Sequence, residues 1–400
     1  MNVIFLTLSV NVNIEDRGIY SDLMRKFKNE GHHIYIVASV PRRTTKRTEI
    51  VEKDGVTYLN VWTLNIQQTN VIEKGIGTLL IENQYQHAIG KYLGNVNFDL
   101  ILYSTPPITF TNVVKYLKMK NPNAISYLLL KDIFPQNAVD IGMFGERSIF
   151  NWYFRKKEVE LYKNSDYIGC MSPANVEFFI KHNPSYPIGH VEVAPNSVEL
   201  AALDNFGLKK KVVVRKKYGL PIKKTIFIYG GNLGKPQGIP FLMECLNKNG
   251  NRTDCHFVIV GSGTELPKLQ RWYKHKRPVS VTLMCGLPKT EYDELVSCCD
   301  VGLIFLDHRF TIPNYPSRLL SYLENKMPIL CATDSNTDIG SIAEENGYGY
   351  WCESLEVENF TALIDKMLSS DIKIMGENGY NFLKANYQVD NTYNVIVSHF

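Results

Sequence analysis

The sequence predicts an α/β protein made of two doubly wound domains, and three observations support this class. Short apolar runs that suit strands alternate with amphipathic helical stretches along the whole chain, which is typical of parallel sheets covered by helices. The alternation breaks once, after Asn196, in a lysine-rich connector that ends at Gly219-Leu220-Pro221. A chain of 400 residues, 44% hydrophobic and 21% charged, is too long for one core and suits two.

Parallel sheets bind ligands at the carboxyl ends of their strands, so the natural active site is expected in a cleft between the two domains. The tail from Ile372 to Phe400 is helical and aromatic, and its residues 373–400 are a candidate to cross back to the first domain. The expected domains are therefore 1–200 and 201–372. The predicted strands are Val3–Leu8, His33–Ala38, Leu100–Tyr103, Ile125–Leu130, Tyr167–Met171, Val191–Ala194, Ile226–Tyr229, His256–Val260, Val279–Thr282, Val301–Phe305 and Ile329–Ala332.

Charge and cysteine content exclude several classes of protein. A formal net charge of +4 is well short of what drives nucleic-acid binding, so no nucleic-acid partner is expected. The eight cysteines include no C-x-x-C pair, and the histidines lack the spacing of a metal site, so we expect reduced thiols and no metal or other cofactor. No apolar run reaches the roughly 18 residues of a membrane span, and the opening run is a strand rather than a signal peptide. A cytoplasmic location follows from this interpretation.

The most informative motif is the apolar run Ile226–Tyr229, which leads directly into the glycine-rich segment Gly230–Gly238. Glycines let backbone N–H groups approach an anion, and the helix expected near Ile239 adds the positive end of its dipole. Lys235 supplies a full positive charge. The spacing is neither that of a P-loop nor that of the dinucleotide fingerprint, and tight packing between strand and helix is the alternative explanation. The segment predicts a phosphate site of another kind.

Further candidate binding loops follow the later strands of the second half. Gly261-Ser262-Gly263 and Gly286-Leu287-Pro288 allow backbone contact with a base or a ribose, although packing explains such glycines equally well. Beyond them, Pro316 ends a loop, Ser317 is expected to cap a helix, and Arg318 joins the free N–H groups of that helix in a second anion site. Two anion sites in one domain suit a diphosphate.

In this order, the motifs of the second half resemble the donor domain of glycosyltransferase family 4, which has the GT-B fold of two Rossmann-like domains facing a central cleft. The segments that carry the resemblance are YGGNLGK at 229–235, VIVGSG at 258–263, CGLP at 285–288 and PSRLLSYLENKMPIL at 316–330.

The first half is similar to the acceptor domain of the same family. Asp16-Arg17-Gly18 and Asn29–Ile34 resemble its first glycine loop and helix, and Val193–Val198 resembles its closing segment. Lys131–Ala138, with Gly142-Met143 after it, is similar to a bacterial branch that builds capsule and O-antigen repeats, some members of which transfer N-acetyl-L-fucosamine. The resemblance spans essentially the whole chain and implies a retaining, metal-independent enzyme with a UDP-sugar donor.

Carried over residue by residue, the resemblance is uneven. It implies that Gly231, Asn232, Lys235 and Arg318 hold the donor pyrophosphate, but the family usually has arginine where Asn232 stands and lysine where Gln237 stands. Most of the positive charge then falls to Lys235 and Arg318.

The family's paired glutamates, eight positions apart, align with Pro313 and Ser321. The second glutamate normally holds the ribose hydroxyls, so Ser321 is expected to make a weaker bond of that kind, and Glu324, one turn later, is an alternative. The remaining expected donor-binding residues are Gly18, Gly261, Gly286, Leu287 and Ser317.

The implied mechanism is electrostatic. Negative charge grows on the departing nucleoside diphosphate, and Lys235, Arg318, the two helix starts and the Gly18 loop would stabilise it, each fixed donor contributing about 3–4 kcal/mol. Asp132 follows a predicted strand and is our candidate to orient or deprotonate the acceptor hydroxyl, with helix capping as the alternative role.

The implied acceptor is a sugar on a polyprenyl diphosphate lipid, so we expect the first domain to touch the inner face of the cell membrane as a peripheral protein. Phe150–Lys157 joins aromatic bulk to positive charge, which suits an interface, although core packing explains the aromatic residues equally well. The segment from Ile66 to Thr78 is expected to be a loop beside the acceptor.

Two other functions fit the same architecture. A non-hydrolysing UDP-N-acetylglucosamine 2-epimerase needs no acceptor, but its acidic and histidine constellation is not evident in the sequence. A GT-B scaffold that has lost catalysis and serves as a partner subunit is suggested by Pro313 and Ser321 in place of acids. Turnover separates the three functions.

Overall fold

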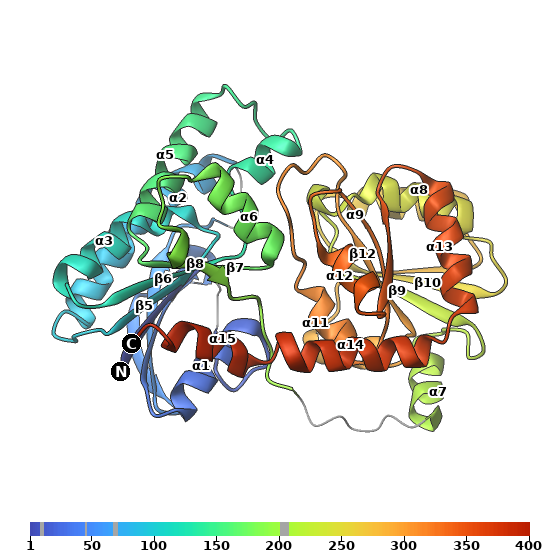
Figure 1. Cartoon of the computed structure of the whole chain (residues 1–400), viewed down its shortest axis with the longest axis horizontal. Coiled ribbons are helices and arrows are strands. Elements are labelled where there is room, and N and C mark those ends of the chain that lie inside the picture. Colours follow the sequence, from blue (N-terminus) through green and yellow to red (C-terminus); the bar gives the residue numbers. More distant parts are fainter. Residues whose placement is uncertain (9–11, 45, 67–70, 201–207) are drawn as a thin grey trace. The chain divides into compact units, whose positions relative to one another are not determined.

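The computed structural model describes residues 1–8, 12–44, 46–66, 71–200 and 208–400. The chain divides into two compact units, each a mainly parallel sheet with helices packed on it (Figure 1). Unit 1 comprises Met1–Glu199 and Val389–Phe400, and unit 2 comprises Leu200–Gln388. The predicted α/β class with two doubly wound domains is confirmed.

Unit 1 contains a sheet in the order β3-β4-β2-β1-β5-β6-β7-β8. The central strands β1 and β5 are mainly apolar and are buried at every residue except Asn2, because helices cover both faces of a doubly wound sheet. The strands are β1 Asn2–Thr7, β2 His33–Pro41, β3 Glu49–Lys53, β4 Val56–Thr63, β5 Leu100–Ser104, β6 Ile125–Leu130, β7 Tyr167–Cys170 and β8 Val191–Val193.

The helices of unit 1 include one from the far end of the chain, α15, whose Val389 and Ile396 lie in the core of this unit. The helices are α1 Ile19–Asn29, α2 Val71–Tyr92, α3 Thr111–Lys120, α4 Gln136–Asp140, α5 Ile149–Lys163, α6 Pro173–His182 and α15 Val389–Val397, with short 3-10 turns η1 Arg42–Thr44, η2 Ile108–Phe110 and η3 Ile188–His190.

Unit 2 contains a parallel sheet in the order β11-β10-β9-β12-β13-β14, so the central strand β9 is the one that leads into the glycine-rich turn. Its strands are β9 Thr225–Asn232, β10 Cys255–Ser262, β11 Val281–Cys285, β12 Val301–Phe305, β13 Ile329–Thr333 and β14 Gly349–Glu353. Its helices are α7 Leu208–Lys217, η4 Lys235–Gln237, α8 Ile239–Asn249, α9 Leu266–Lys276, α10 Lys289–Ser297, α11 Arg318–Glu324, α12 Ile339–Glu345, α13 Val357–Ser369 and α14 Ile372–Asn386.

The sheet of unit 1 is not wholly parallel, because β3 and β4 form an antiparallel hairpin that the sequence analysis missed. The hairpin turns at Asp54-Gly55, and both residues have positive φ, at 52° and 70°. Asp-Gly between two strand-like runs is a strong signal for this type of turn. Strand β11 also begins later than predicted, since Val279 is 79% exposed and lies before it.

The expected loop from Ile66 to Thr78 is wrong from Val71 onward, where the helix α2 begins, while residues 67–70 lie outside the described residues. Its two glycines suggested a loop because glycine weakens helices. Gly77 has a packing reason instead, since a Cβ there would lie 2.9 Å from Cγ2 of Ile66. Close approach of the preceding chain to the helix requires a residue without a side chain.

The lysine-rich connector is also partly helical, because Leu208–Lys217 forms α7 in unit 2. Arg215 is buried and anchors this helix. Its guanidinium pairs with Asp300 at 2.5 Å and donates to the carbonyl oxygens of Cys298 and Ile222. A charge pattern that indicates a solvent-exposed linker therefore contains one cation that faces inward.

The carboxyl-terminal tail is helical as predicted, but only Val389–Phe400 belongs to unit 1, whereas α14 stays with unit 2 and packs against α11. The expected boundary at residue 372 therefore differs from the division in the structure by one helix. Of the helices that the structure describes, none is long and apolar enough to cross a membrane.

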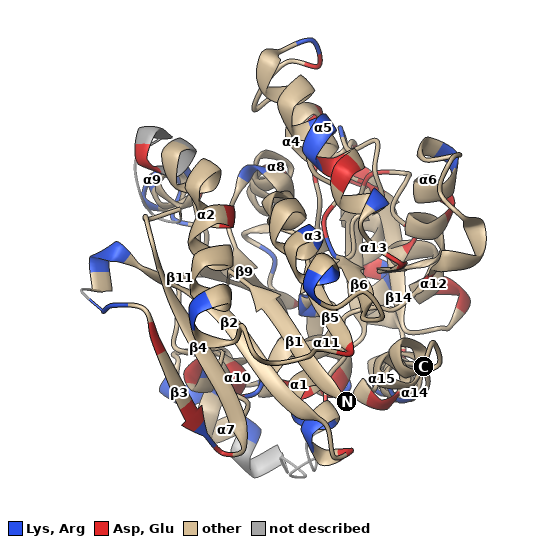
Figure 2. Cartoon of the chain, turned by 90° about the vertical axis from the view of Figure 1, so that its left-hand side faces the viewer, with Lys and Arg blue, Asp and Glu red and all other residues tan. Residues whose placement is uncertain are grey.

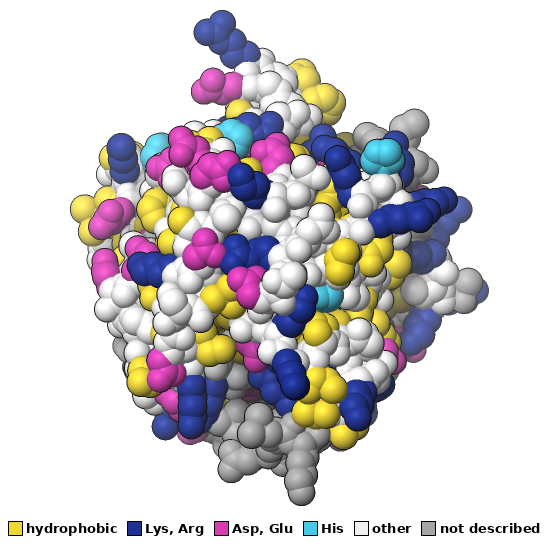
Figure 3. Space-filling model, turned by 90° about the vertical axis from the view of Figure 1, so that its right-hand side faces the viewer, with side chains coloured by type: hydrophobic (Ala, Val, Ile, Leu, Met, Phe, Trp, Pro, Cys, Tyr) yellow, Lys and Arg dark blue, Asp and Glu magenta, His cyan; other side chains and the backbone are white. Residues whose placement is uncertain are grey.

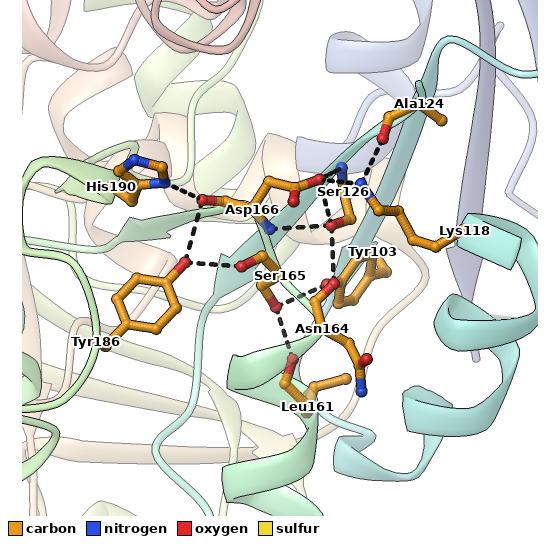
Figure 4. Close-up of polar contacts among 10 residues, drawn as sticks. All are labelled: Tyr103, Lys118, Ala124, Ser126, Leu161, Asn164, Ser165, Asp166, Tyr186 and His190. Carbon is orange, nitrogen blue, oxygen red and sulfur yellow. Dashed lines mark hydrogen bonds and ion pairs between the residues drawn. The ribbon is translucent and has the colours of Figure 1, made fainter. Parts of the chain in front are cut away.

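A polar network ties the amino ends of β6 and β7 together, at the edge of the sheet opposite the ligand-binding edge (Figure 4). Asp166 accepts hydrogen bonds from the ammonium of Lys118 at 2.6 Å and from the backbone N–H and hydroxyl of Ser126. Tyr186 and His190 bond the backbone oxygen of Asp166. Burial acts to raise the pKa of Asp166, but these bonds outweigh it and hold the pKa below its ordinary value.

We predict that Asp166→Asn lowers the free energy of unfolding at pH 7 by about 1–3 kcal/mol, because the charged partner of Lys118 is lost. A carboxyl whose pKa is lowered by folding stabilises the fold above its unfolded pKa and loses that contribution as the pH falls. The difference between the variant and the wild type should therefore shrink below about pH 4, measured by urea unfolding across pH. Glu177→Gln, at an exposed carboxylate of α6, is the matched control. Equal losses in the two variants at pH 7 would contradict the assignment.

Candidate functional site

The candidate site of unit 2 lies at the carboxyl ends of β9, β10 and β11. Gly261 pairs in register with Gly231 on one side and Cys285 on the other, and Ser262 pairs with Asn232. The predicted loops that follow these strands therefore meet along one edge of the sheet. Gly286 lies beside them, since a Cβ there would be 3.6 Å from Cβ of Ser262.

Glycine at this edge permits close contact between backbones. Gly231 has a φ of 113°, in the region that side chains rarely adopt. A Cβ on Gly261 would lie 1.9 Å from the carbonyl oxygen of Gly231, so no larger residue fits there without displacing the turn. Gly238 has a φ of 55° and directly precedes the first residue of α8. Close backbone packing and the approach of a ligand thus both require residues without a side chain in this turn.

Arg318 reaches the glycine turn from α11. Its guanidinium lies over the ring of Tyr229, with Cζ 4.3 Å from the ring centroid. Its Nη2 donates to Oε1 of Gln237 and lies close to Gly231, where a Cβ would be 3.9 Å away. The side chain of Gln237 also accepts from the hydroxyl of Tyr229, which bonds the carbonyl oxygen of Asn232 as well.

One nitrogen of the Arg318 guanidinium makes no hydrogen bond within the described residues. Nη1 of Arg318 is buried and has no hydrogen-bond partner among the residues that the structure describes. A buried donor on a charged group without a partner is costly, and the cost is removed when an anion accepts from it. The two anion sites predicted from the sequence, the glycine turn and Arg318, are brought together in the structure.

Two further tyrosines, Tyr322 and Tyr292, contact Gly230 at the start of the glycine turn. The hydroxyl of Tyr322 accepts from the backbone N–H of Gly230 at 3.2 Å and donates to the carbonyl oxygen of Ile228 at 3.2 Å. Tyr292 packs directly on Gly230, where a Cβ would lie 2.1 Å from its hydroxyl. Contacts with these two tyrosines therefore fix the backbone at Gly230 before any ligand binds.

The other predicted donor-side residues lie around this centre. Lys235 is exposed in η4, and its ammonium forms no ion pair within the described parts of the chain. Asn232 is exposed, whereas Leu287 is half-buried. Ser321 is half-buried and lies one turn after Arg318 in α11. Glu324 is the last residue of that helix, about two helical turns from Arg318 at its start.

Ser317 occupies the position before α11 but does not cap it. Its φ and ψ of −63° and −15° are helical, and its side chain makes no capping hydrogen bond. A capping side chain requires extended backbone at this residue. The expectation of a Ser317 cap is therefore wrong, although the helix begins where it was predicted to begin.

In unit 1, Asp132 follows β6 at the carboxyl edge of the sheet. The hydroxyl of Thr105 accepts from the backbone N–H groups of both Lys131 and Asp132, at 3.0 and 3.2 Å, and so fixes this loop. Burial raises the pKa of Asp132 to about 6, and its charge acts in turn on the hydroxyl of Tyr20. A carboxyl with this pKa changes its protonation near neutral pH, as a general base must.

The neighbouring Lys131 is also perturbed. Burial lowers the pKa of its ammonium to about 7, and the ammonium donates to the carbonyl oxygen of Ala194 at 3.2 Å. The side chain of Lys131 thus ties the end of β6 to the segment after β8, while Asp132 remains available.

Gly18 lies at the start of α1 with an extended φ of 168°. Its N–H donates to the carboxylate of Asp22 at 3.1 Å, and Asp22 also pairs with Arg25 at 2.6 Å. The N–H of Gly18 is therefore satisfied inside unit 1 in this structure.

Sequence reasoning did not single out Tyr229, Tyr322, Tyr292 or Thr105. Tyr229 stands immediately before the glycine turn and Tyr322 stands four residues after Arg318, so helical and strand spacing would have placed both near the turn. Nothing in the sequence pattern marks Thr105. It directly follows β5, and its hydroxyl accepts from the N–H of Asp132, which follows the neighbouring strand β6.

We predict that Gly261→Ala lowers the thermal unfolding midpoint of unit 2, because its Cβ would meet the backbone oxygen of Gly231 and force the turn to move. Overpacking of this kind costs about 1–3 kcal/mol or more. Gly286→Ala is the matched control, since its Cβ would meet only an ordinary contact. Equal midpoints for the two variants in calorimetry would show that the turn is not held by this contact.

Comparison with known proteins identifies relatives in sequence and in fold. Residues 211–382 match the family model of glycosyl transferases group 1. The sequence is 22% identical over 302 residues to the probable glycosyltransferase WbjE of Pseudomonas aeruginosa, covering 74% of this chain and 70% of that protein.

Solved structures of similar fold cover the whole chain. Sucrose-phosphate synthase of Thermosynechococcus elongatus has a TM-score of 0.74 at 14% identity, with 100% of this chain and 98% of that chain covered. HepE of Anabaena in complex with UDP has a TM-score of 0.69 at 12% identity, with 100% and 99% covered. The E. coli trehalose-6-phosphate protein bound with UDP-2-fluoro glucose has a TM-score of 0.73 at 8% identity, with 100% and 98% covered. Residues 211–382 thus form a glycosyl transferases group 1 domain, the chain has the GT-B fold, and the protein is a glycosyltransferase of that type.

Proposed function

We propose that the protein transfers a sugar, with retention of anomeric configuration, from a UDP-sugar to a polyprenyl-diphosphate-linked acceptor in capsule or O-antigen synthesis. N-acetyl-L-fucosamine is the sugar to test first, since Lys131–Ala138 resembles the branch that transfers it. Two proteins of the same fold were solved with UDP or a UDP-sugar analogue bound, which supports UDP as the leaving group.

The observation that carries the proposal is Arg318 at the glycine turn. Its buried Nη1 has no hydrogen-bond partner among the described residues, and its Nη2 lies beside Gly231. The start of α8 adds its dipole after Gly238. A diphosphate at this turn would accept from the guanidinium and from backbone N–H groups at the same time.

This arrangement stabilises the leaving group more than the intact donor. As the bond between sugar and phosphate breaks, negative charge grows on the diphosphate, and a donor already fixed on Tyr229 needs no reorganisation. Lys235 is exposed and adds a weaker, solvent-screened attraction. With these cations in place, the proposed donor binding needs no metal ion.

Ribose recognition is the part of the proposal with the weakest side-chain chemistry. Ser321 stands where the family has a glutamate, and its hydroxyl offers one neutral hydrogen bond in place of a charged one. Glu324 is the alternative, and comparison of Ser321→Ala with Glu324→Gln separates them.

In unit 1, Asp132 is the proposed group that orients or deprotonates the acceptor hydroxyl. Its carboxylate forms no hydrogen bond within the described residues, and burial raises its pKa to about 6. The proton of the acceptor hydroxyl would pass to this carboxylate as the new glycosidic bond forms.

One observation favours a second function, that of a catalytically inactive partner subunit. Pro313 and Ser321 stand at both positions where the family has acids. Such a protein would bind a nucleotide weakly or not at all and would show no turnover.

The test of the donor site is calorimetric titration of UDP, GDP and UDP-sugars into the wild type and Arg318→Ala. We expect UDP to bind the wild type and to bind the variant about ten- to hundredfold more weakly, since a hydrogen bond to a charged group contributes about 1.5–3 kcal/mol. Arg271→Ala, at an exposed arginine of α9 in the same unit, should bind UDP normally. Equal affinity of Arg318→Ala and the wild type would remove Arg318 from the site, and no binding to the wild type would favour the inactive subunit.

The test of Asp132 is the pH dependence of transfer. Because the ionised form must act, activity should fall about tenfold per pH unit below about 6 and level off above it. Asp132→Asn should lose about 100- to 10,000-fold of the rate and also lose this acidic limb, whereas Glu177→Gln should keep both. An acidic limb that persists in Asp132→Asn would assign the base to another group.

A further inference from the structure

Unit 1 contains an apolar pocket that neither Asp132 nor the donor turn uses. It has a volume of about 290 Å³ and is formed by the ends of β1, β5 and β6 together with the helices α2 and α5. Leu8, Pro107, Phe134, Ile81 and Phe154 line it, and its exposed lining is mainly apolar. The volume is at the lower end of the roughly 300–1,000 Å³ of small-ligand sites, so the pocket suits part of a hydrocarbon chain.

A buried ion pair joins the two helices that line the pocket. Lys157 of α5 and Glu82 of α2 lie 2.7 Å apart, with side chains only 14% and 7% exposed. Oε1 of Glu82 accepts from the backbone N–H of Asn112, and Oε2, which contacts Lys157, also accepts from the side-chain amide of Asn112. The pocket begins one helical turn before this pair on both helices, at Thr78 and Phe154. A satisfied buried polar contact and the apolar walls of the pocket therefore lie on the same two helices.

Large apolar side chains on the two helices that line the pocket, the apolar rim, are exposed among the residues that the structure describes. On α2, Leu79 is 57% exposed and Ile76 is 48% exposed. On α5, Ile149, Phe150 and Trp152 are 74%, 62% and 66% exposed. Both groups stand in the amino-terminal halves of α2 and α5, which both line the pocket and are joined by the Lys157–Glu82 pair. The two helices can be followed in Figures 1 and 2. Gathered exposed apolar side chains of this kind mark an interaction surface.

The contrast with another face of the molecule is visible in Figure 3. There, hydrophobic side chains occur in small groups among Lys, Arg, Asp and Glu side chains of both signs. That face needs no partner to explain it, since scattered exposed apolar residues are normal.

The outward stripe of α5 adds positive charge to the apolar rim. Trp152, Lys156, Val159 and Lys163 follow at helical spacing and are all exposed. Neither Lys156 nor Lys163 has an ion pair within the part of the chain that the structure describes. An aromatic and aliphatic end followed by unpaired cations is complementary to a bilayer with anionic headgroups.

We infer that this end of unit 1, from the pocket to the outward face of α5, is a lipid-binding surface. The rim enters an anionic bilayer, and the pocket takes a hydrocarbon chain drawn from it. The inference rests on the proposed lipid-linked acceptor and adds to it the place where the apolar part of such an acceptor binds.

The surface is tested by flotation with vesicles of phosphatidylcholine alone and of phosphatidylcholine with phosphatidylglycerol. The wild type should float with the anionic vesicles, and Ile149→Glu/Trp152→Glu should float at least tenfold less. The matched control is Met119→Glu/Ile188→Glu, which places the same charges on side chains of unit 1 that are 72% and 66% exposed but lie away from the pocket. A control that loses binding equally, or a wild type that does not float, would overturn the surface assignment.

The pocket is tested with a fluorescent fatty acid, dansyl-undecanoic acid, and its displacement by farnesyl phosphate. Thr78→Phe fills the pocket and should weaken probe binding at least tenfold, whereas Thr78→Val keeps the volume and should bind normally. Probe binding that is unchanged in Thr78→Phe would overturn the pocket assignment.

UDP titration of every variant separates this inference from the proposed function. Lost lipid binding with intact UDP binding supports the surface, since the fold and the donor site are then preserved. A wild type that binds UDP but no lipid overturns the surface alone, and one that binds lipid but no UDP overturns the donor assignment alone.

Discussion

The proposed donor site of unit 2 depends on one contact, the guanidinium of Arg318 over the ring of Tyr229. The contact fixes a charge beside a turn whose backbone allows no side chain at Gly231 or Gly261. Tyr322 supports the same turn through the N–H of Gly230. Aromatic side chains hold the cation in place without neutralising it, so its charge stays available to a ligand, whereas a carboxylate in the same place would have cancelled it.

The sequence pattern predicted most of the fold because buried parallel strands are apolar runs that end in glycine or polar loops. The central strands β6 and β12 lie where they were expected, at Ile125–Leu130 and Val301–Phe305. The predictions of secondary structure were wrong where the local composition favoured a loop or linker but the chain forms a helix. Gly75 and Gly77 suggested a loop in α2, and the charge of α7 suggested a linker, because neither the close approach of Ile66 nor the burial of Arg215 is visible in a linear pattern.

For the candidate site, the sequence located the turn and Arg318 but not what holds them. Gly231 and Arg318 are far apart in the chain, and their proximity follows from the sheet order, which places β9 next to β12 and hence near α11. Gln237 was noticed as a departure from the family's lysine, and the structure gives it a contact, an acceptor shared by Arg318 and Tyr229. The roles of Lys235, Ser321, Glu324 and Asp132 stay predictions, because their ligands are what would define them.

Unit 1 is built from two separate stretches of chain, and this has a consequence for biosynthesis. Val389 and Ile396 complete its core, and the N–H of Val389 bonds the carbonyl oxygen of Val198 at 3.0 Å. A ribosome delivers these residues only after all of unit 2, which is continuous from Leu200 to Gln388. Unit 1, most of which is translated before unit 2, therefore closes its core only after unit 2 has been made, and until then its apolar seam is an exposed surface that chaperones would meet.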